Sequence, residues 1–516
     1  MFTDTGDTTT TDESRPLAGE QITVVGSGFG GLSTACYLAD AGADVTVVEQ
    51  HDHLGGVAGT IERDGFTFDT GPSWYLMPDT FERFFGHFDR DPADYYDLVH
   101  LDPHYRVFWK DGDSVALSDD LDHVRSTFES YETGAGGAFD DYLAEARHTY
   151  EVGMERFVYE DRQRLRDFLD PEVVKSARGL TFFGSMQDHV EKYVDHPKLQ
   201  QLLQYTLVFL GGSPYNTPAL YNLMAHVDFD LGVYYPEGGI HAVVEGIAEM
   251  ARELGVTFET GTPVEGIEVD PEGVGVITPD DYRVADRVVS NANPAHVERD
   301  LLPPDHRSHD PGYWDEQTYA PSAFMLYLGV EGDVGPLEHH SLVLPTDWEA
   351  HFDAIFEEPR WPEDPSYYLS VTSQTDDTVA PEGHHAVVIL VPIAPGLPDG
   401  EKVRTEYREK ILADLAENVG VDLRDRIVVA ESACVSEYTE LFGAPKGTAL
   451  GLAHTLTQTG PLRPGHRDDS LDGLYYAGSF TTPGIGMPMT LVSGEHAAEA
   501  VVEDATEQGV FGGLLN

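Results

Sequence analysis

The chain has 516 residues, with 91 Asp and Glu against 31 Lys and Arg, which gives a formal net charge of −60. At roughly 150 residues per domain, this length predicts two or three domains, and the lack of a basic patch argues against nucleic-acid binding. The acids are scattered along the chain and would repel one another in dilute buffer. At about 1 M salt the Debye length is only roughly 3 Å, so we expect the cytoplasm of a salt-loving organism.

Residues 1–19 are acidic, rich in Thr and without an apolar core, so we expect a disordered leader and no signal peptide. The cysteines, Cys36 and Cys434, are far apart and form no CxxC pair, so no zinc site or disulfide framework is predicted and no metal is expected. The chain also lacks a run of about 18 uncharged apolar residues, which argues against a spanning helix. Any contact with the inner face of the cell membrane would then be peripheral.

Residues 22–49 predict a strand, a glycine-rich turn, a helix and a second strand, the arrangement of a dinucleotide-binding unit. Gly26 permits the tight turn, Gly28 lets the backbone approach a pyrophosphate, and Gly31 allows close packing of helix on strand. Glu49 ends the second strand, where an acid accepts hydrogen bonds from ribose hydroxyls. The helix N-terminus adds N–H donors and a positive potential.

Three features favour FAD over a nicotinamide nucleotide. The doublet Gly55-Gly56 follows the acid and would bring more backbone against the dinucleotide. A late strand and small-residue turn, residues 473–479, could hold the ribityl and flavin end. No second strand, GxGxxG turn and helix is found in the sequence, so a separate NAD(P)H site is not supported.

The remaining pattern predicts an α/β fold: a Rossmann-like FAD-binding domain, an inserted mixed α+β substrate domain, and a helical region that faces either the core or a membrane. The predicted divisions are a leader (1–19), the first part of the FAD-binding domain (20–79), the helical substrate- or membrane-facing region (80–233), the second FAD-binding part (234–293), the substrate domain (294–465) and the third FAD-binding part (466–516).

Two apolar helical faces lie in the predicted helical region. One repeats Phe at Phe81, Phe84, Phe85 and Phe88, and the other repeats Leu at Leu199, Leu202, Leu203, Leu207 and Leu210. This spacing puts each set on one side of a helix. Core packing is the default interpretation, and contact with a membrane surface is the alternative.

No arrangement of His, Asp or Ser has spacing that supports acid–base chemistry, so no catalytic residue is assigned. The adjacent pairs His339-His340 and His384-His385 would point to opposite faces of a strand, and we expect them to be solvated.

Six segments together resemble the phytoene desaturase family of FAD-dependent carotenoid desaturases, in its haloarchaeal type, within the amine-oxidase-like flavoproteins. The resemblance covers nearly the whole chain. Its segments are VVGSGFGGLSTACYLADAGADVTVVEQ with the following LGG, DGFTFDTGPSWYLMPD, GGSPYNTPALY at 211–221, YYPEGGIHAVVEGIA at 234–248, and AGSFTTPGIGMPM at 477–489.

The resemblance implies that FAD binds through Gly26, Gly28, Gly31, Glu49, Gly55, Gly56, Val264, Gly478, Ser479, Gly486 and Met487. Val264, in the strand after the helix that begins near Gly239, would meet adenine through its backbone, and the last four residues would lie near the ribityl and isoalloxazine. Two positions depart from the common pattern. Val57 stands where an Arg usually reaches the pyrophosphate, and Ser479 stands where many flavoproteins carry an acid.

The implied reaction is hydride transfer from an acyclic carotenoid to flavin with formation of a C=C bond. Steps from phytoene toward lycopene and 3,4-desaturation toward bacterioruberin-type pigments are both compatible with the sequence, and quinone or oxygen could reoxidise the flavin. A flavin amine oxidase-like enzyme and a non-catalytic prenyl-lipid carrier on the same fold are the alternatives. A segment rich in Phe, Leu and Tyr suits a long apolar polyene better than a cationic amine.

Overall fold

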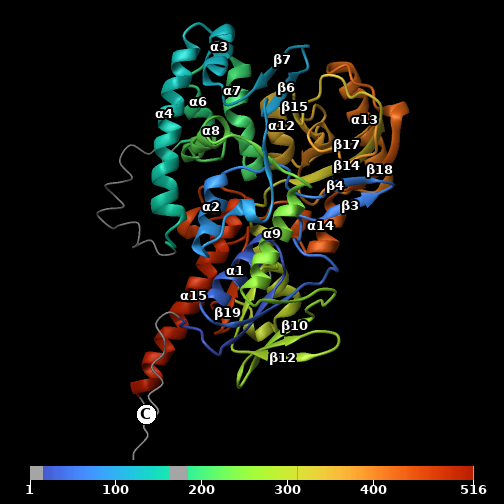
Figure 1. Cartoon of the computed structure of the whole chain (residues 1–516). Coiled ribbons are helices and arrows are strands. Elements are labelled where there is room, and N and C mark those ends of the chain that lie inside the picture. The colour runs from blue at the N-terminus through green and yellow to red at the C-terminus, as the bar shows by residue number, and fades with distance from the viewer. Residues whose placement is uncertain (1–14, 163–183, 311, 515–516) are drawn as a thin grey trace, which may run out of the picture.

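The computed structural model describes residues 15–162, 184–310 and 312–514. Figure 1 shows two halves: a five-stranded sheet with α1, α9 and α15 below, and a seven-stranded sheet beside a group of helices above. Residues 1–14 of the expected leader lie outside the described residues. The prediction was wrong for its last residues, because Leu17 is fully buried and its N–H donates to Ala41 O at 3.0 Å.

The lower half is built on a parallel sheet assembled from three distant parts of the chain, in the order β19-β13-β1-β2-β9. Its strands are β1 (Gln21–Val25), β2 (Asp44–Val48), β9 (Thr257–Glu259), β13 (Arg287–Ser290) and β19 (Leu474–Tyr476). Their apolar residues are almost continuous because both faces are covered. Helices α1 (Phe29–Asp40), α9 (Ile240–Glu253) and α15 (Met487–Leu514) cover one face. The three-stranded sheet of β10 (Gly266–Asp270), β11 (Gly273–Ile277) and β12 (Tyr282–Ala285) packs against the other.

Helices α1 and α15 approach each other closely. A Cβ on Gly494 of α15 would lie 2.6 Å from Gly30 O, so only glycine fits this crossing. The Ser33 hydroxyl donates to Leu491 O at 2.7 Å across the same contact. The last helix of the chain is thereby fixed against the first glycine-rich turn.

The upper half contains a mainly antiparallel sheet in the order β18-β14-β17-β16-β15-β6-β7. Its strands are β6 (Tyr105–Trp109), β7 (Ser114–Leu117), β14 (Ser322–Glu331), β15 (His340–Leu344), β16 (Tyr367–Ser370), β17 (His384–Ile393) and β18 (Ile427–Ala433). Helix α13 (Glu401–Asn418) covers one face through Ile411, Leu412 and Leu415. Residues 98–117, expected to lie in a helical region, therefore include strands. Successive side chains of β6 point to opposite faces of the sheet: Val107 and Trp109 pack in one core, and Phe108 packs in the core beneath α13.

The helices beside this sheet share one core with β6 and β7. They are α3 (Leu121–Tyr131), α4 (Ala135–Gly153), α6 (Met186–Val190), α7 (Pro197–Gln204) and α8 (Met224–Phe229). Two 3-10 helices, η4 (Tyr205–Leu210) and η5 (Ala219–Leu223), lie between α7 and α8 in the chain. The described strands and α-helices that remain are β3 (Thr60–Arg63), β4 (Phe66–Asp69), β5 (Leu98–His100), β8 (Tyr234–Pro236), α2 (Pro78–His87), α10 (Pro294–His296), α11 (Tyr313–Glu316), α12 (Trp348–Phe352) and α14 (Val435–Phe442).

The two apolar helical faces pack inside the protein, so a membrane contact through them is ruled out in this conformation. Phe81 and Phe85 of α2 are fully buried against α1 and α9. Leu199 and Leu207 are fully buried in the helical core, and Leu210 borders the large cavity described below. Each face is matched by an apolar neighbour, which is the more stable arrangement in water.

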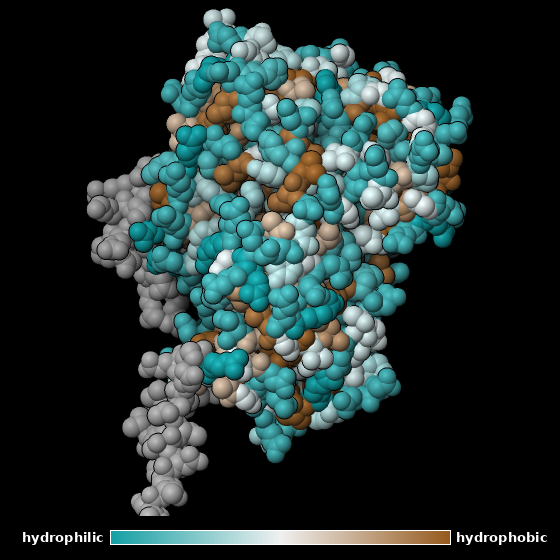
Figure 2. Space-filling view, in the orientation of Figure 1, coloured by the Kyte–Doolittle hydropathy of each residue, from teal (hydrophilic) through white to brown (hydrophobic). Residues whose placement is uncertain are grey.

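The view in Figure 2 is largely hydrophilic, and its hydrophobic residues lie in separate groups. Such a surface fits the formal charge of −60. Among the helices of the described residues, none combines the length and apolar character needed to cross a bilayer.

Candidate functional site

A cavity of about 1030 Å³ lies between the five-stranded sheet and the upper half. Its volume reaches the upper end of the range of about 300–1,000 Å³ typical of small-molecule sites. We call one part the nucleotide cradle, formed by residues 26–30, 48–51 and 55–57 with Val264. The other part is the apolar chamber, whose walls include Trp74, Leu76, Met77, Met154, Val158, Tyr205, Leu210, Leu223, Met224, Leu342, Leu344 and Leu390.

Glycines shape the cradle at the carboxyl end of β1. Gly26 has φ +94° and donates its N–H to Val48 O at 2.8 Å, which joins the turn to β2. A Cβ on Gly28 would lie 2.6 Å from Asn291 Oδ1, and a Cβ on Gly31 would lie 2.1 Å from Gly26 O. Gly28 therefore gives the close backbone approach and Gly31 the close helix packing expected of this motif.

Glu49 is 4% exposed and faces the same turn. Its Oε2 accepts hydrogen bonds from Ser27 N at 2.9 Å and Ser27 Oγ at 2.7 Å, and its Oε1 accepts one from His51 N at 2.9 Å. These donors fix the carboxylate at the mouth of the cradle. Carboxylate oxygens have further lone pairs that can accept hydrogen bonds from ribose hydroxyls.

The doublet Gly55-Gly56 lies against the first glycine turn. Both residues have positive φ, +106° and +59°, and a Cβ on Gly56 would come within 3.5 Å of Gly28 Cα. Val57 is 38% exposed and lines the cavity where the family's usual Arg would stand. Val264 also lines the cavity, but it lies in the loop between β9 and β10 rather than in a strand.

The late turn after β19 closes the other side of the cradle. Gly478, Ser479, Gly486 and Met487 all line the cavity. Asn291, at the end of β13, bridges the two glycine turns: its Nδ2 donates to Ala477 O at 3.1 Å, and a Cβ on Gly478 would meet the same atom at 2.6 Å. Of the expected FAD-binding residues, all except Gly31 line the cavity.

A buried cation lies beneath the late turn. Arg463 is 4% exposed and donates to the carbonyls of Leu452, Gln458, Ser479 and Thr481. No carboxylate forms an ion pair with it among the described residues, and burial lowers its pKa to about 10. The Arg463 charge makes the turn at Ser479 electropositive, and no acid at position 479 offsets it. A positive potential favours a cofactor that gains negative charge when it accepts electrons, so the residues of this turn suit a bound flavin.

Tyr221 and His454 form a polar pair in the wall of the cavity. Ile485 N donates to His454 Nε2 at 3.1 Å, so the neutral ring carries its proton on Nδ1 and donates it to the Tyr221 hydroxyl. Burial and the nearby Arg463 hold the pKa of His454 well below its usual range. Tyr221 and His454 both line the cavity, beside the turn that contains Ile485.

The FDTGP and GGI segments meet at Asp69, while Thr70, Gly71 and Pro72 of FDTGP line the cavity. Asp69 Oδ2 accepts the N–H of Ile240 at 3.1 Å and so caps the start of α9. A Cβ on Gly239 would lie 2.7 Å from this oxygen. These segments join the glycine doublet to the helix that covers the parallel sheet.

The prediction that His339 and His340 are solvated was wrong. They are 4% and 0% exposed, and His340 stacks on Trp74 with ring centroids 4.5 Å apart. Its Nδ1 is 2.7 Å from the Tyr368 hydroxyl. His340 thereby supports an aromatic wall of the chamber.

Sequence reasoning missed Asn291, His454 and Arg463. Asn291 follows a parallel strand, and polar residues at such ends often meet ligands, so its position offered a signal. His454 and Arg463 lie in a loop without periodicity, and only the fold brings Arg463 to Ser479 and His454 to Ile485.

Residues 29–502 match the family described as flavin containing amine oxidoreductase. The chain is 61% identical over 490 residues to a carotenoid 3,4-desaturase of Haloarcula japonica, covering 95% of this chain and 99% of that protein. It is 34% identical over 506 residues to a zeta-carotene-forming phytoene desaturase of Myxococcus xanthus, covering 96% of each.

Solved structures share the fold at low identity. An oxidoreductase from Methanosarcina mazei has a TM-score of 0.58 at 17% identity, covering 94% of this chain and 100% of that one. A putrescine oxidase bound to putrescine has a TM-score of 0.60 at 15% identity, covering 95% and 99%.

Proposed function

We propose that this protein desaturates a carotenoid. The chain belongs to the flavin-containing amine oxidoreductase family and, within it, to the carotenoid desaturases. It is an oxidoreductase whose cofactor is FAD. Its substrate is an acyclic carotenoid, which loses one hydride and one proton and gains one C=C bond. The observation that carries the proposal is the single cavity in which the nucleotide cradle opens into the apolar chamber.

In the proposed reaction the nucleotide cradle binds FAD and the apolar chamber orients the polyene. Bound FAD supplies an acceptor for hydride from an allylic C–H. Gly26, Gly28 and the α1 N-terminus would hold the pyrophosphate, Glu49 the ribose, and the turn at Gly478 the flavin end. The chamber walls would hold the polyene against that end and exclude water, so that the reacting carbon stays oriented.

The apolar chamber argues against a cationic amine as substrate. Its walls contain Trp74, Leu342 and Leu390, and the described carboxylate residues that line the cavity, Glu49, Asp300 and Glu440, are not among the residues that define the chamber. Binding a buried ammonium group without a counter-charge would be costly. The same chamber suits an uncharged polyene.

For the bond, we propose 3,4-desaturation, with the earlier steps from phytoene as the alternative. The relative that is 61% identical carries the 3,4-desaturase name. Pigment analysis of a deletion strain separates the two reactions. Accumulation of coloured dihydro intermediates supports 3,4-desaturation, whereas accumulation of colourless phytoene shows that the earlier reaction depends on this protein.

Activity itself is tested with purified protein under anaerobic conditions. We expect the yellow flavin absorption to bleach when a polyene with a 3,4-dihydro end is added, with a matching red shift of the polyene. A protein that binds polyene without bleaching would be a lipid carrier instead. Re-addition of oxygen or a quinone then identifies the acceptor.

We also propose a peripheral contact with the inner membrane face, because the substrate is stored in lipid. The charge of −60 would oppose docking on anionic lipid in dilute buffer, and salt screens that repulsion. Vesicle co-sedimentation should therefore rise from low to molar salt. Falling association would contradict the proposal.

A further inference from the structure

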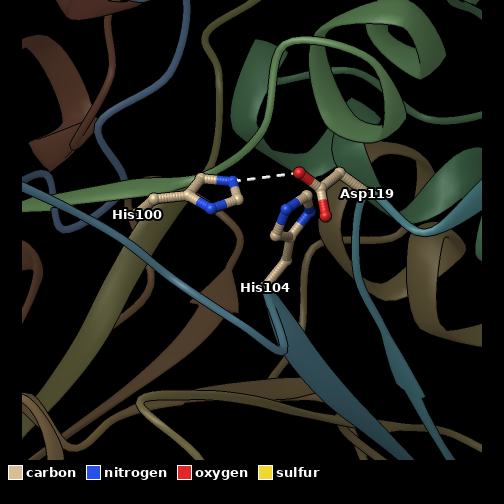
Figure 3. Close-up of side chains that lie close together, drawn as sticks. All are labelled: His100, His104 and Asp119. Carbon is tan, nitrogen blue, oxygen red and sulfur yellow. Dashed lines mark ion pairs between the residues drawn. The ribbon is translucent and has the colours of Figure 1, made fainter.

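Two histidines and an aspartate, His100, His104 and Asp119, lie close together (Figure 3). His100 ends β5, His104 immediately precedes β6, and Asp119 follows β7. None of the three lines the large cavity. They are the only such group in the described residues whose histidines come from one short segment of chain.

The geometry of this group matches a metal site. One ligand atom of each residue lies within 4.8 Å of the others, and His100 Nε2 is 3.4 Å from Asp119 Oδ2. Two ligands about 2.0–2.1 Å from a tetrahedral ion are roughly 3.3–3.4 Å apart. The H-x3-H spacing is also one that zinc sites use.

His104 supplies an independent observation. Its side chain is 1% exposed, and Nε2 is a buried atom without a hydrogen-bond partner in the described part of the chain. The ring also lies beside the backbone of Asp228, where an outer contact can orient a metal-binding histidine. Buried polar atoms are rarely left unpaired, so the unpaired Nε2 atom of His104 indicates a position where a ligand binds.

We propose that His100, His104 and Asp119 bind one divalent cation of the zinc type. Imidazole nitrogen and carboxylate oxygen suit Zn²⁺, Co²⁺ or Ni²⁺ better than Mg²⁺, which prefers oxygen ligands. Three protein ligands leave a fourth position for water, and the 38% and 49% exposure of the His100 and Asp119 side chains gives solvent access.

The ion has a structural role in this position. His100 pairs with Tyr234 in the β5–β8 ribbon, and β8 leads into α9 of the lower half. His104 and Asp119 flank the β6–β7 hairpin of the seven-stranded sheet. A shared ion would connect these two elements at the junction of the halves.

A second group, Asp161, His466 and His496, provides the comparison. Both ring nitrogens of His466 already have partners, Tyr476 O and Thr482 Oγ1, each at 3.0 Å. A metal there would have to break existing hydrogen bonds. The first group requires no such change at His104 Nε2.

The test uses FAD-loaded full-length protein stripped with a chelator and titrated with Co²⁺ in molar KCl and excess Mg²⁺, which saturates surface carboxylates. We expect one equivalent to bind and give the strong visible band of tetrahedral cobalt, at wavelengths beyond the flavin absorption. Zn²⁺ should displace it and raise the unfolding midpoint by a few degrees.

His100→Gln and Asp119→Asn change exposed side chains, so both should fold, and each should lose the band and the thermal shift. His123→Gln is the matched control, an exposed histidine of the neighbouring α3, and should retain both. Unchanged binding in both ligand variants, or a loss only in His466→Gln, would overturn the proposal. So would a wild-type protein that binds no equivalent of Co²⁺ or Zn²⁺.

Discussion

The nucleotide cradle and the apolar chamber are parts of one cavity that are built in opposite ways. The cradle is made of backbone and one fixed carboxylate, Glu49. A Cβ would meet another atom at 2.6 Å on Gly28 of the cradle, and at 2.1 Å on Gly31, which packs against the same turn from outside the cavity. The chamber is made of side chains such as Leu210, Leu342 and Trp74, contributed by distant elements. The difference teaches that one methyl group should abolish function in the cradle, whereas the chamber should tolerate changes that alter affinity gradually.

The largest expected effect is that of Gly31→Ala. The new Cβ would lie 2.1 Å from Gly26 O, a backbone atom that cannot move without disturbing the turn. We expect a loss of stability of about 3 kcal/mol or more and protein purified nearly without FAD. Flavin absorbance per chain and thermal unfolding measure both.

Gly86→Ala is the control, because no atom lies within 4 Å of its new Cβ in α2. It should be neutral or stabilise by up to about 1 kcal/mol. Equal FAD loss in both variants would show that the cradle is not specially constrained.

Glu49→Gln should weaken FAD binding by about 10- to 100-fold, or about 1.5–3 kcal/mol. The carboxylate accepts three hydrogen bonds through both oxygens, and bonds to a charged group contribute about this much each. Titration of apo-protein with FAD gives the dissociation constant. Ser27→Ala, which keeps the carboxylate, should cost less; the reverse order would contradict the role of Glu49.

Asp228, behind the chamber wall, tests the effect of pH. Its Oδ2 accepts from Tyr105 and Tyr205, and desolvation raises its pKa to about 7. The folded state therefore binds a proton that the unfolded state releases near pH 4, and stability falls as pH rises through this window. Between pH 5 and 7 the titration of this residue should lower the free energy of unfolding by about 2 kcal/mol.

Asp228→Asn should remove that part of the slope while both tyrosines keep an acceptor. Denaturant unfolding of wild type and variant at fixed molar KCl, from pH 5 to 8, measures the difference. Parallel curves would mean that Asp228 does not titrate in this range.

The smallest effect is expected for Leu210→Gln in the chamber wall. The protein should retain FAD, while kcat/KM for the polyene falls roughly tenfold, or about 1.4 kcal/mol, because a polar amide replaces apolar contact. Val428→Gln, at a strand position that is 53% exposed and outside the cavity, is the control. Loss of FAD from Leu210→Gln would contradict the separate roles of the cradle and the chamber.

The sequence by itself determined the nucleotide half of this protein. Gly26, Gly28, Gly31 and Glu49 are close in sequence because one strand–turn–helix–strand unit makes the cradle, and local spacing reports local geometry. Helix α9 and strands β13, β14 and β17 could likewise be predicted from periodicity. The prediction that residues 98–117 belong to a helical region failed because β15, the strand that ties the β6–β7 hairpin into the large sheet, is more than 200 residues away from β6.

Only the tertiary structure decided which apolar faces are buried, and which polar residues meet. The Phe81 and Leu199 faces show the same amphipathic pattern whether a core or a membrane covers them, and the packed neighbours resolve the choice. His100, His104 and Asp119 lie within one short segment that the β6–β7 hairpin folds together. Tyr221 and His454, by contrast, are 233 residues apart and meet only in the folded chain. Spacing along the chain carries no record of such contacts, because the fold, not the sequence interval, sets the distance between them.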